Sequence, residues 1–152
     1  AGAGHVMYKV CSTFDSTDAG NIGPVTDVLR SRSGADWSLV TPAFPETGRT
    51  VYMGHLFVGD VLLSDSGMKD HPLTPMRDAN LVRVLQAQCR RRVGLIDHRA
   101  VAAGQCAIRA RIDELKAQGV AIAIVDAVSN DDLLRLGPAL ADLPLVTGDS
   151  PR

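Results

Sequence analysis

The 152-residue chain is predicted to be an α/β protein, a three-layer α/β/α fold with a mostly parallel sheet and an inserted β-hairpin. Two observations predict this class. Apolar runs of strand length alternate with segments of helical period through the second half, which implies a parallel sheet with helices on both faces. Residues 121–125 are apolar at every position, as expected of a parallel strand that is covered on both sides.

The elements of the first half follow from local patterns. An apolar run that ends in hydroxyl residues indicates a buried strand, whereas a stretch of Ser, Thr, Asp and Gly indicates a loop. Pro42 stops a strand because proline lacks a backbone donor. The expected elements are a strand over 6–13, a loop over 15–23, a helix with Asn21 as N-cap to about residue 33, a strand over 37–41, and strands over 50–58 and 61–63 around a Gly59-Asp60 turn.

The second half begins with a long loop over 64–77, which is expected to be ordered. Pro72 and Pro75 restrict its backbone, and Met68, Leu73 and Met76 can be buried. The remaining elements are a helix capped by Asp78, a strand over 93–97, a helix over 107–118 closed by Gly119, a strand over 121–126, a helix over 130–141 and a strand over 145–147.

Composition excludes several classes of protein. A net charge of −1 with six aromatic residues argues against a nucleic-acid binder, and no apolar stretch approaches the length that spans a bilayer. Three cysteines without a C-x-x-C pair favour a reduced, cytoplasmic protein, with Cys11 as a small core residue. The histidines are too widely spaced for a metal signature, so no metal site is expected. A homo-oligomer remains possible.

Three segments at the carboxyl ends of predicted strands are candidates for ligand binding, namely residues 12–16, 42–49 and 126–130. The run from Lys9 to Thr17 combines four hydroxyl side chains with the carboxylate of Asp15, and a polyol needs such mixed donors and acceptors. Asp15 can take or orient the proton of a sugar hydroxyl. Backbone donors at the helix start, near residues 21–23, would favour an anion. The alternative is that Asp15 and its neighbours only cap a turn.

Arg49 follows two prolines and Gly48, in a rigid segment that suits a planar charged group. The arginine fork matches a small carboxylate or phosphate. The alternative is a solvated arginine in a proline-rich loop. A four-carbon acid is small, so its binding groups must lie within about 10 Å of one another in one small-ligand pocket. Arg49 is therefore expected to converge on the loop over residues 12–16.

These motifs together resemble the four-carbon acid sugar kinases. The resemblance rests on segments in consistent order over nearly the whole chain: residues 8–17 (YKVCSTFDST), 21–23 (NIG), 42–45 (PAFP), 48–54 (GRTVYMG), 56–58 (LFV) and 69–78 (KDHPLTPMRD). Residues 68–78 look most like the 3-oxo-tetronate kinases, with D-threonate and D-erythronate kinases as alternatives. Two features depart from the family: no Asp-Asp-Phe-Thr-Gly-Ala segment occurs, and residues 147–151 read TGDSP where the family usually reads TGGSG.

The resemblance implies a two-domain cytoplasmic enzyme that phosphorylates the terminal hydroxyl of a four-carbon acid sugar. Residues 1–148 would be the sugar-acid-binding domain, incomplete at its N-terminus, and residues 149–152 a junction to an absent domain that binds ATP with Mg. Asp15 is assigned to acceptor activation and Arg49 to the substrate carboxylate. The remaining substrate contacts are assigned to Lys9, Ser12, Thr13 and Ser16. The alternative class is a non-catalytic sugar-acid-binding module that uses the same pocket. In both cases the expected partner is a small-molecule sugar acid.

Overall fold

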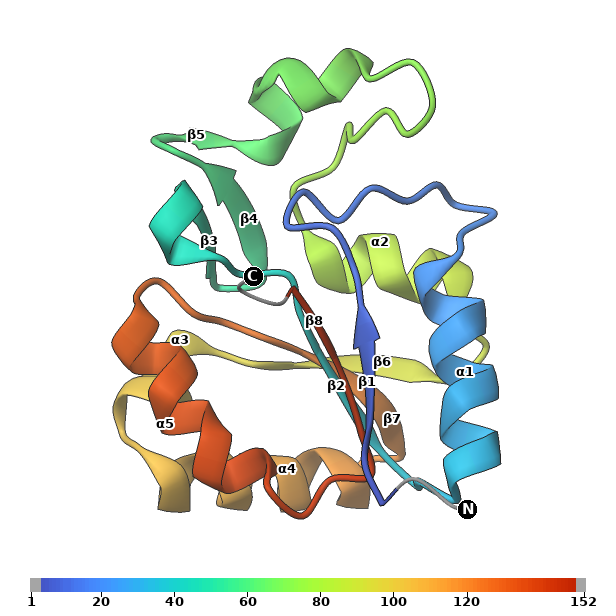
Figure 1. Cartoon of the computed structure of the whole chain (residues 1–152), viewed down its shortest axis with the longest axis vertical. Coiled ribbons are helices and arrows are strands. Elements are labelled where there is room, and N and C mark those ends of the chain that lie inside the picture. The colour runs from blue at the N-terminus through green and yellow to red at the C-terminus, as the bar shows by residue number, and fades with distance from the viewer. Residues whose placement is uncertain (1–3, 150–152) are drawn as a thin grey trace.

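The computed structural model describes residues 4–149, and its central feature is a five-stranded parallel sheet (Figure 1). The strand order is β1-β8-β2-β7-β6, and every neighbouring pair is parallel. The strands are β1 (Val6–Lys9), β2 (Ser38–Thr41), β6 (Arg92–Ile96), β7 (Val120–Val125) and β8 (Leu145–Gly148). The predicted parallel sheet is therefore confirmed.

Helices cover both faces of this sheet, which confirms the three-layer prediction (Figure 1). One face carries α1 (Ile22–Ser33) and α2 (Leu81–Gln88), and the other carries α3 (His98–Ala102), α4 (Gln105–Ala117) and α5 (Asn130–Leu140). The short helix α3 was not predicted. Gly119, at φ 76°, follows the end of α4 as predicted, because the left-handed conformation there suits glycine.

Strand β7 connects two hydrophobic clusters. All six of its residues are buried; Ile122 and Ile124 belong to the cluster under α1 and α2, whereas Ala123 and Val125 belong to the cluster under α3, α4 and α5. Removing one isoleucine or valine side chain from water contributes about 1.5–3 kcal/mol. The continuous apolar pattern of β7 therefore follows from its central place, with helices above and below.

The predicted hairpin is a separate three-stranded antiparallel sheet. Its strands are β3 (Arg49–Tyr52), β4 (His55–Val58) and β5 (Val61–Leu62). The prediction of one strand over 50–58 is wrong, because the chain reverses at Met53 and Gly54, which have φ of 48° and 75°. Backbone hydrogen bonds between Val51 and Ala127 join this small sheet to the end of β7.

The loop over residues 64–77 has a defined structure, as predicted. It contains two short 3-10 helices (Leu63–Asp65 and Gly67–Asp70), and the Met76 N–H donates to the Met68 carbonyl over 2.9 Å. Met76 is buried, but Leu73 is 80% exposed, so the predicted burial of Leu73 is wrong.

Two further local predictions are corrected. The N-cap of α2 is Asn80, whose side chain accepts the Arg83 N–H, whereas Asp78 accepts both the Asn80 N–H and the Arg83 guanidinium. Strand β1 ends at Lys9, because the chain then turns through a hydrogen bond between the Phe14 N–H and the Cys11 carbonyl. Cys11 is consequently exposed and does not lie in the core.

Candidate functional site

The carboxyl ends of the five parallel strands lie at one edge of the central sheet. Three further parts of the chain lie over this edge. These are the loop between β1 and α1, the small antiparallel sheet, and the segment over residues 63–79 (Figure 1). All the predicted ligand-binding segments leave strands at this edge. Within residues 4–149 no helix is long and apolar enough to cross a membrane, and no group of three potential metal ligands occurs.

Thr13 and Asp15 form a hydrogen-bonded pair in the loop after β1. The Thr13 Oγ1 donates to Asp15 Oδ1 over 2.5 Å, and Cys11 Sγ lies 3.2 Å from the same hydroxyl. Because the Thr13 proton goes to Asp15, the Cys11 thiol is the donor in the second contact. Thr13 is buried and Asp15 is half-buried. The carboxylate is thus oriented through one oxygen, while Oδ2 makes no hydrogen bond with the described residues.

Ser16 connects this loop to two helices. Its hydroxyl donates to Asn21 Oδ1 over 2.7 Å and accepts from Gln88 Nε2 over 2.8 Å. The Asn21 N–H reaches the same oxygen at 3.4 Å. Ser16 is buried, with 4% of its surface exposed. Ser12, by contrast, is half-buried, and its hydroxyl makes no hydrogen bond among residues 4–149.

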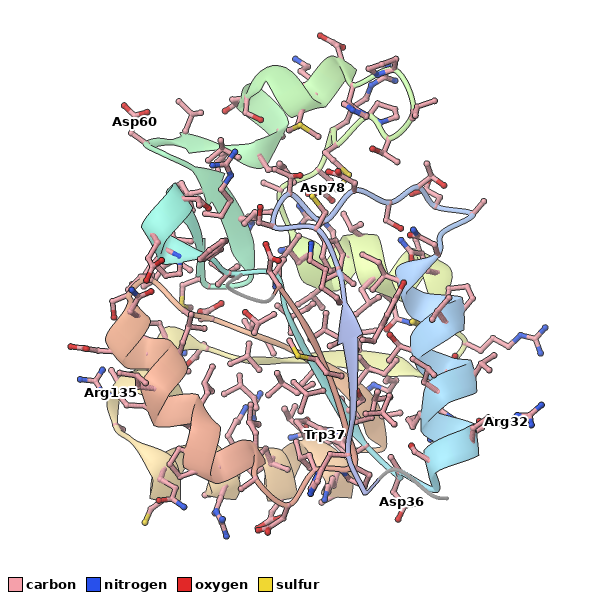
Figure 2. All side chains as sticks on the ribbon, viewed as in Figure 1. Arg32, Asp36, Trp37, Asp60, Asp78 and Arg135 are labelled. Atoms are coloured by element: carbon pink, nitrogen blue, oxygen red, sulfur yellow. The ribbon has the colours of Figure 1, made fainter. Side chains whose placement is uncertain are left out.

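A pocket of about 460 Å³ separates the β1–α1 loop from the end of the ordered loop. This volume lies within the range of about 300–1,000 Å³ that holds small ligands. Figure 2 labels Asp78 where the ordered loop passes beside the segment that follows β1. The pocket is lined by Ser16, Thr17, Asp18, Pro75, Met76, Arg77, Asp78 and Val84. The cavity therefore brings together two segments that are distant in sequence, the β1–α1 loop and the end of the ordered loop.

Lys9 points to the opposite face of the sheet. Tyr8 and Val10 pack in the cluster under α1 and α2, so the intervening Lys9 faces α5. Its Nζ lies 3.3 Å from Asp149 Oδ1. Asp149 belongs to a second pocket of about 470 Å³, lined also by Thr41, Ala43, Phe44, Glu46, Asn130, Leu133 and Leu134. Lys9 and Ser16 therefore do not share a pocket.

Arg49 begins β3 and lines neither of these two pockets. Its backbone pairs with Phe44 in both directions, at 2.8 and 3.1 Å, and its Nη1 donates to the Thr47 carbonyl. Its Nε is buried and has no partner among the described residues. The small sheet and the β1–α1 loop lie at the same edge of the central sheet (Figure 1), but within residues 4–149 no hydrogen bond or ion pair joins Arg49 to residues 12–16. Their convergence on one ligand stays a prediction.

Two of the three backbone donors at the start of α1, where the sequence suggested an anion site, are already used within the protein. The Gly23 N–H donates to Gln88 Oε1 over 2.9 Å, and Pro24 has no N–H. Asn21 occupies the N-cap position but makes no capping hydrogen bond with its side chain. The expectation of free donors at residues 21–23 is therefore wrong for Gly23, because a glutamine from another helix satisfies it.

Asp126 is a polar residue whose role the sequence did not indicate. It follows β7 and is fully buried, and its carboxylate accepts the N–H groups of Met53, Gly54 and His98 over 2.6, 2.9 and 2.8 Å. Burial raises the pKa of Asp126, while the three N–H donors act in the opposite direction. This carboxylate fixes the β3–β4 turn and the start of α3, so it supports the site without lining either pocket.

Comparison with known proteins identifies the chain's relatives. A family model described as a sugar-binding N-terminal domain matches residues 1–151. The chain belongs to this family. It is 60% identical over 149 residues to a 3-oxo-tetronate kinase of Burkholderia multivorans and 60% identical to one of Pseudomonas fluorescens. Each match covers 98% of this chain but 35% of the kinase, so the chain spans about a third of the length of these relatives.

Solved structures agree with this family and with the fold. The Haemophilus influenzae protein HI1011 superposes with a TM-score of 0.95 at 52% identity, covering 97% of this chain and 36% of that protein. A Bordetella bronchiseptica protein containing a domain of unknown function superposes with a TM-score of 0.76 at 28% identity, covering 99% of this chain and 35% of that protein. Its structure is described as a domain-swapped dimer with bound citrate.

Proposed function

We propose that this chain is the part of an ATP-dependent kinase that binds the acceptor, a four-carbon acid sugar of the 3-oxo-tetronate type. The observation that carries the proposal is the oriented Thr13–Asp15 pair, which immediately precedes the pocket wall formed by residues 16–18. The family description and the names of the relatives support the substrate class. Since the chain spans about a third of those kinases, ATP with Mg would be bound outside the described residues.

Phosphoryl transfer depends mainly on positioning and on charge neutralisation. In the proposed mechanism Asp15 accepts the hydrogen bond of the terminal hydroxyl through Oδ2, aligns that oxygen with the incoming phosphoryl group, and takes the hydroxyl proton as the new O–P bond forms. Thr13 holds Asp15 through Oδ1 and prevents its rotation. Ser12, whose hydroxyl is uncommitted among the described residues, is the proposed contact for a sugar hydroxyl or keto oxygen. Lys9 and Arg49 are the proposed cations for the carboxylate.

The proposal is tested by calorimetric titration of the chain with 3-oxo-tetronate, D-threonate and D-erythronate, and by an ATP-dependent phosphorylation assay of the full-length gene product. Asp15→Asn should lower turnover by about 100-fold or more, because general base assistance is worth roughly 10²–10⁴. Asp65→Asn, on the exposed surface of the ordered loop, is the matched control and should leave turnover unchanged. Binding without turnover by the full-length product would instead favour a non-catalytic sugar-acid-binding module. Absence of binding would contradict both.

Arg49→Lys tests the cation for the carboxylate. Lysine keeps the positive charge but loses the planar fork, so we expect the dissociation constant for the sugar acid to rise by about tenfold, the size of one good charge-assisted hydrogen bond. Arg32→Lys, an exposed arginine near the end of α1, is the control. An unchanged dissociation constant for Arg49→Lys would remove Arg49 from the site and leave Lys9 as the proposed cation.

A further inference from the structure

Gln88 lies at the end of α2, 72 positions from Ser16, and contacts both ends of the segment over residues 16–23. We infer that Gln88 is a positioning residue of the sugar-acid site, and that Ser16 acts through Gln88 and does not contact the ligand. This inference rests on the proposed function, in which the β1–α1 loop binds the sugar. It changes the predicted set of ligand contacts and adds a residue that no motif indicated.

The hydrogen-bonding capacity of Ser16 is already used within the protein. A hydroxyl has one proton and two acceptor sites. The proton goes to Asn21 Oδ1 at 2.7 Å, and the acceptor sites receive Gln88 Nε2 at 2.8 Å and, more weakly, the Asn21 N–H at 3.4 Å. The residue is also buried. A ligand in the adjacent pocket would have to break one of these bonds to gain one from Ser16.

The orientation of the Gln88 amide is fixed by its partners. The Gly23 N–H can only donate, so the atom facing it at 2.9 Å must be the carbonyl oxygen Oε1. The amide nitrogen therefore faces Ser16 and must donate to it. One side chain thus joins the start of the loop to the first turn of α1, and it satisfies a helix donor that would otherwise lack an intrahelical partner.

Two glycines of the loop leave the space that Gln88 occupies. A Cβ at Gly20, where φ is 31°, would lie 2.1 Å from Gln88 Cδ. A Cβ at Gly23 would lie 2.8 Å from Gln88 Cβ and from Cys89 Sγ. Glycines at positions 20 and 23 therefore leave room for the Gln88 side chain, and the loop packs directly against it.

The consequence for the pocket follows from the lining residues. Ser16, Thr17 and Asp18 form one wall of the 460 Å³ pocket, and Asp15 directly precedes them. Without the Gln88 amide, Ser16 keeps only its bonds to Asn21, and the Gly23 N–H loses its partner, so the link from α2 to both ends of the segment over 16–23 is lost. A ligand would then have to order the loop on binding, which weakens affinity although no direct contact has been removed.

The test is a double-mutant cycle measured by calorimetric titration of the sugar acid into the chain. Gln88→Met keeps the side-chain length and removes both hydrogen bonds, and Ser16→Ala removes the hydroxyl. If Ser16 acts through Gln88, each single variant should raise the dissociation constant by about tenfold and the double variant by little more, because coupled residues are not additive. A Ser16→Ala effect that multiplies fully with Gln88→Met would identify Ser16 as a direct contact and overturn the inference.

Gln86→Ala is the matched control, because Gln86 is a glutamine of the same helix that bonds Cys89, Arg91 and Val93 and not the loop. It should leave the dissociation constant unchanged within about twofold. An equal loss of affinity in this control would mean that α2 acts only through overall stability, and would contradict a positioning role for Gln88.

Hydrogen exchange without ligand separates this inference from the proposed function. In Gln88→Met the amides of residues 16–23 should exchange at least about tenfold faster than in the wild type, whether or not any sugar acid binds. Fast exchange in a chain that binds no tetronate would support the anchoring role and reject the proposed function. Unchanged exchange, together with normal tetronate binding by Gln88→Met, would support the proposed function and reject the inference.

Discussion

Asp126 is a buried carboxylate held by three backbone N–H groups from two elements, with no cation bonded to it among residues 4–149. An amide at this position presents only one acceptor oxygen, so at least one of the three donors loses its partner. An unsatisfied buried polar group costs about 1–3 kcal/mol. We therefore expect Asp126→Asn to lower the free energy of unfolding by about 1–3 kcal/mol, measured by urea denaturation. Asp113→Asn, exposed on α4, is the control; an equal loss in both would contradict this account.

The three cysteines differ in burial and therefore in reactivity. Burial, with a further contribution from the charge of Asp27, raises the pKa of the Cys89 thiol to about 11. Cys11 and Cys106 are exposed. Alkylation requires the thiolate, so at about pH 8 iodoacetamide should modify Cys11 and Cys106 well before Cys89, and urea should abolish the difference. Mass spectrometry of digested samples over a time course would measure this, and early modification of native Cys89 would contradict it.

At the scale of elements, the start of α5 is fixed by a capping box between Ser129 and Asp132. Burial raises the pKa of Asp132, but hydrogen bonds from the Val128 N–H and from Ser129, together with nearby His98, outweigh it and hold the pKa below its ordinary value. A carboxyl whose pKa is lowered on folding contributes stability above its ordinary pKa, about 3.9, and loses it as the pH falls below that value.

The loss of folding stability at low pH should therefore depend on Asp132. We expect the urea midpoint of the wild type to fall between about pH 5 and pH 2, and to fall less steeply in Asp132→Asn. At neutral pH the same variant should lose about 1 kcal/mol, the usual value of a helix cap. Asp131→Asn, one position earlier on α5, is the control. Parallel pH profiles for wild type and Asp132→Asn would contradict the assignment.

Elements with a continuous pattern were predictable, and the exceptions have physical causes. Strand β7 and helix α1 were placed closely because apolar runs and helical spacing report burial directly. The turn at Met53 was missed because a methionine at φ 48° carries no turn signal, and the buried carboxylate of Asp126 stabilises this conformation through the Met53 N–H. The Thr13–Asp15 contact joins residues two positions apart, so both could be proposed as site residues from the sequence. The role of Gln88 could not be predicted from the sequence, because its partners Ser16 and Gly23 are more than 60 positions away in the chain.

At the scale of the whole molecule, two pockets lie near the carboxyl ends of the strands, on different sides of the central sheet. The pocket beside Ser16 lies toward α2 and the pocket beside Asp149 toward α5. Lys9, 62% exposed and paired with Asp149, belongs to the second side. A ligand that contacts both Lys9 and Asp15 would have to extend around the end of β1, from one side of the sheet to the other.

The 152-residue chain alone is expected to bind a sugar acid without phosphorylating it. No glycine-rich phosphate loop occurs in the sequence, and the chain spans about a third of the kinases that it resembles. Incubation with ATP, Mg and 3-oxo-tetronate should yield no phosphorylated product by mass spectrometry, with the 3-oxo-tetronate kinase of Burkholderia multivorans as the positive control. Turnover by the chain at the rate of the control would contradict this expectation.

The pairing of β1 with β8 constrains the order in which the chain can fold during synthesis. Val6 pairs with Leu145, so the first strand of the described chain finds its neighbour only when the last strand has left the ribosome. Strand β2 likewise lies between β7 and β8, both of which are made late. Contacts so distant in sequence slow folding, and unpaired strands exposed meanwhile favour aggregation. The nascent chain must therefore hold β1 unpaired until β8 emerges, and a chain interrupted before residue 145 would leave that strand available to bind another molecule.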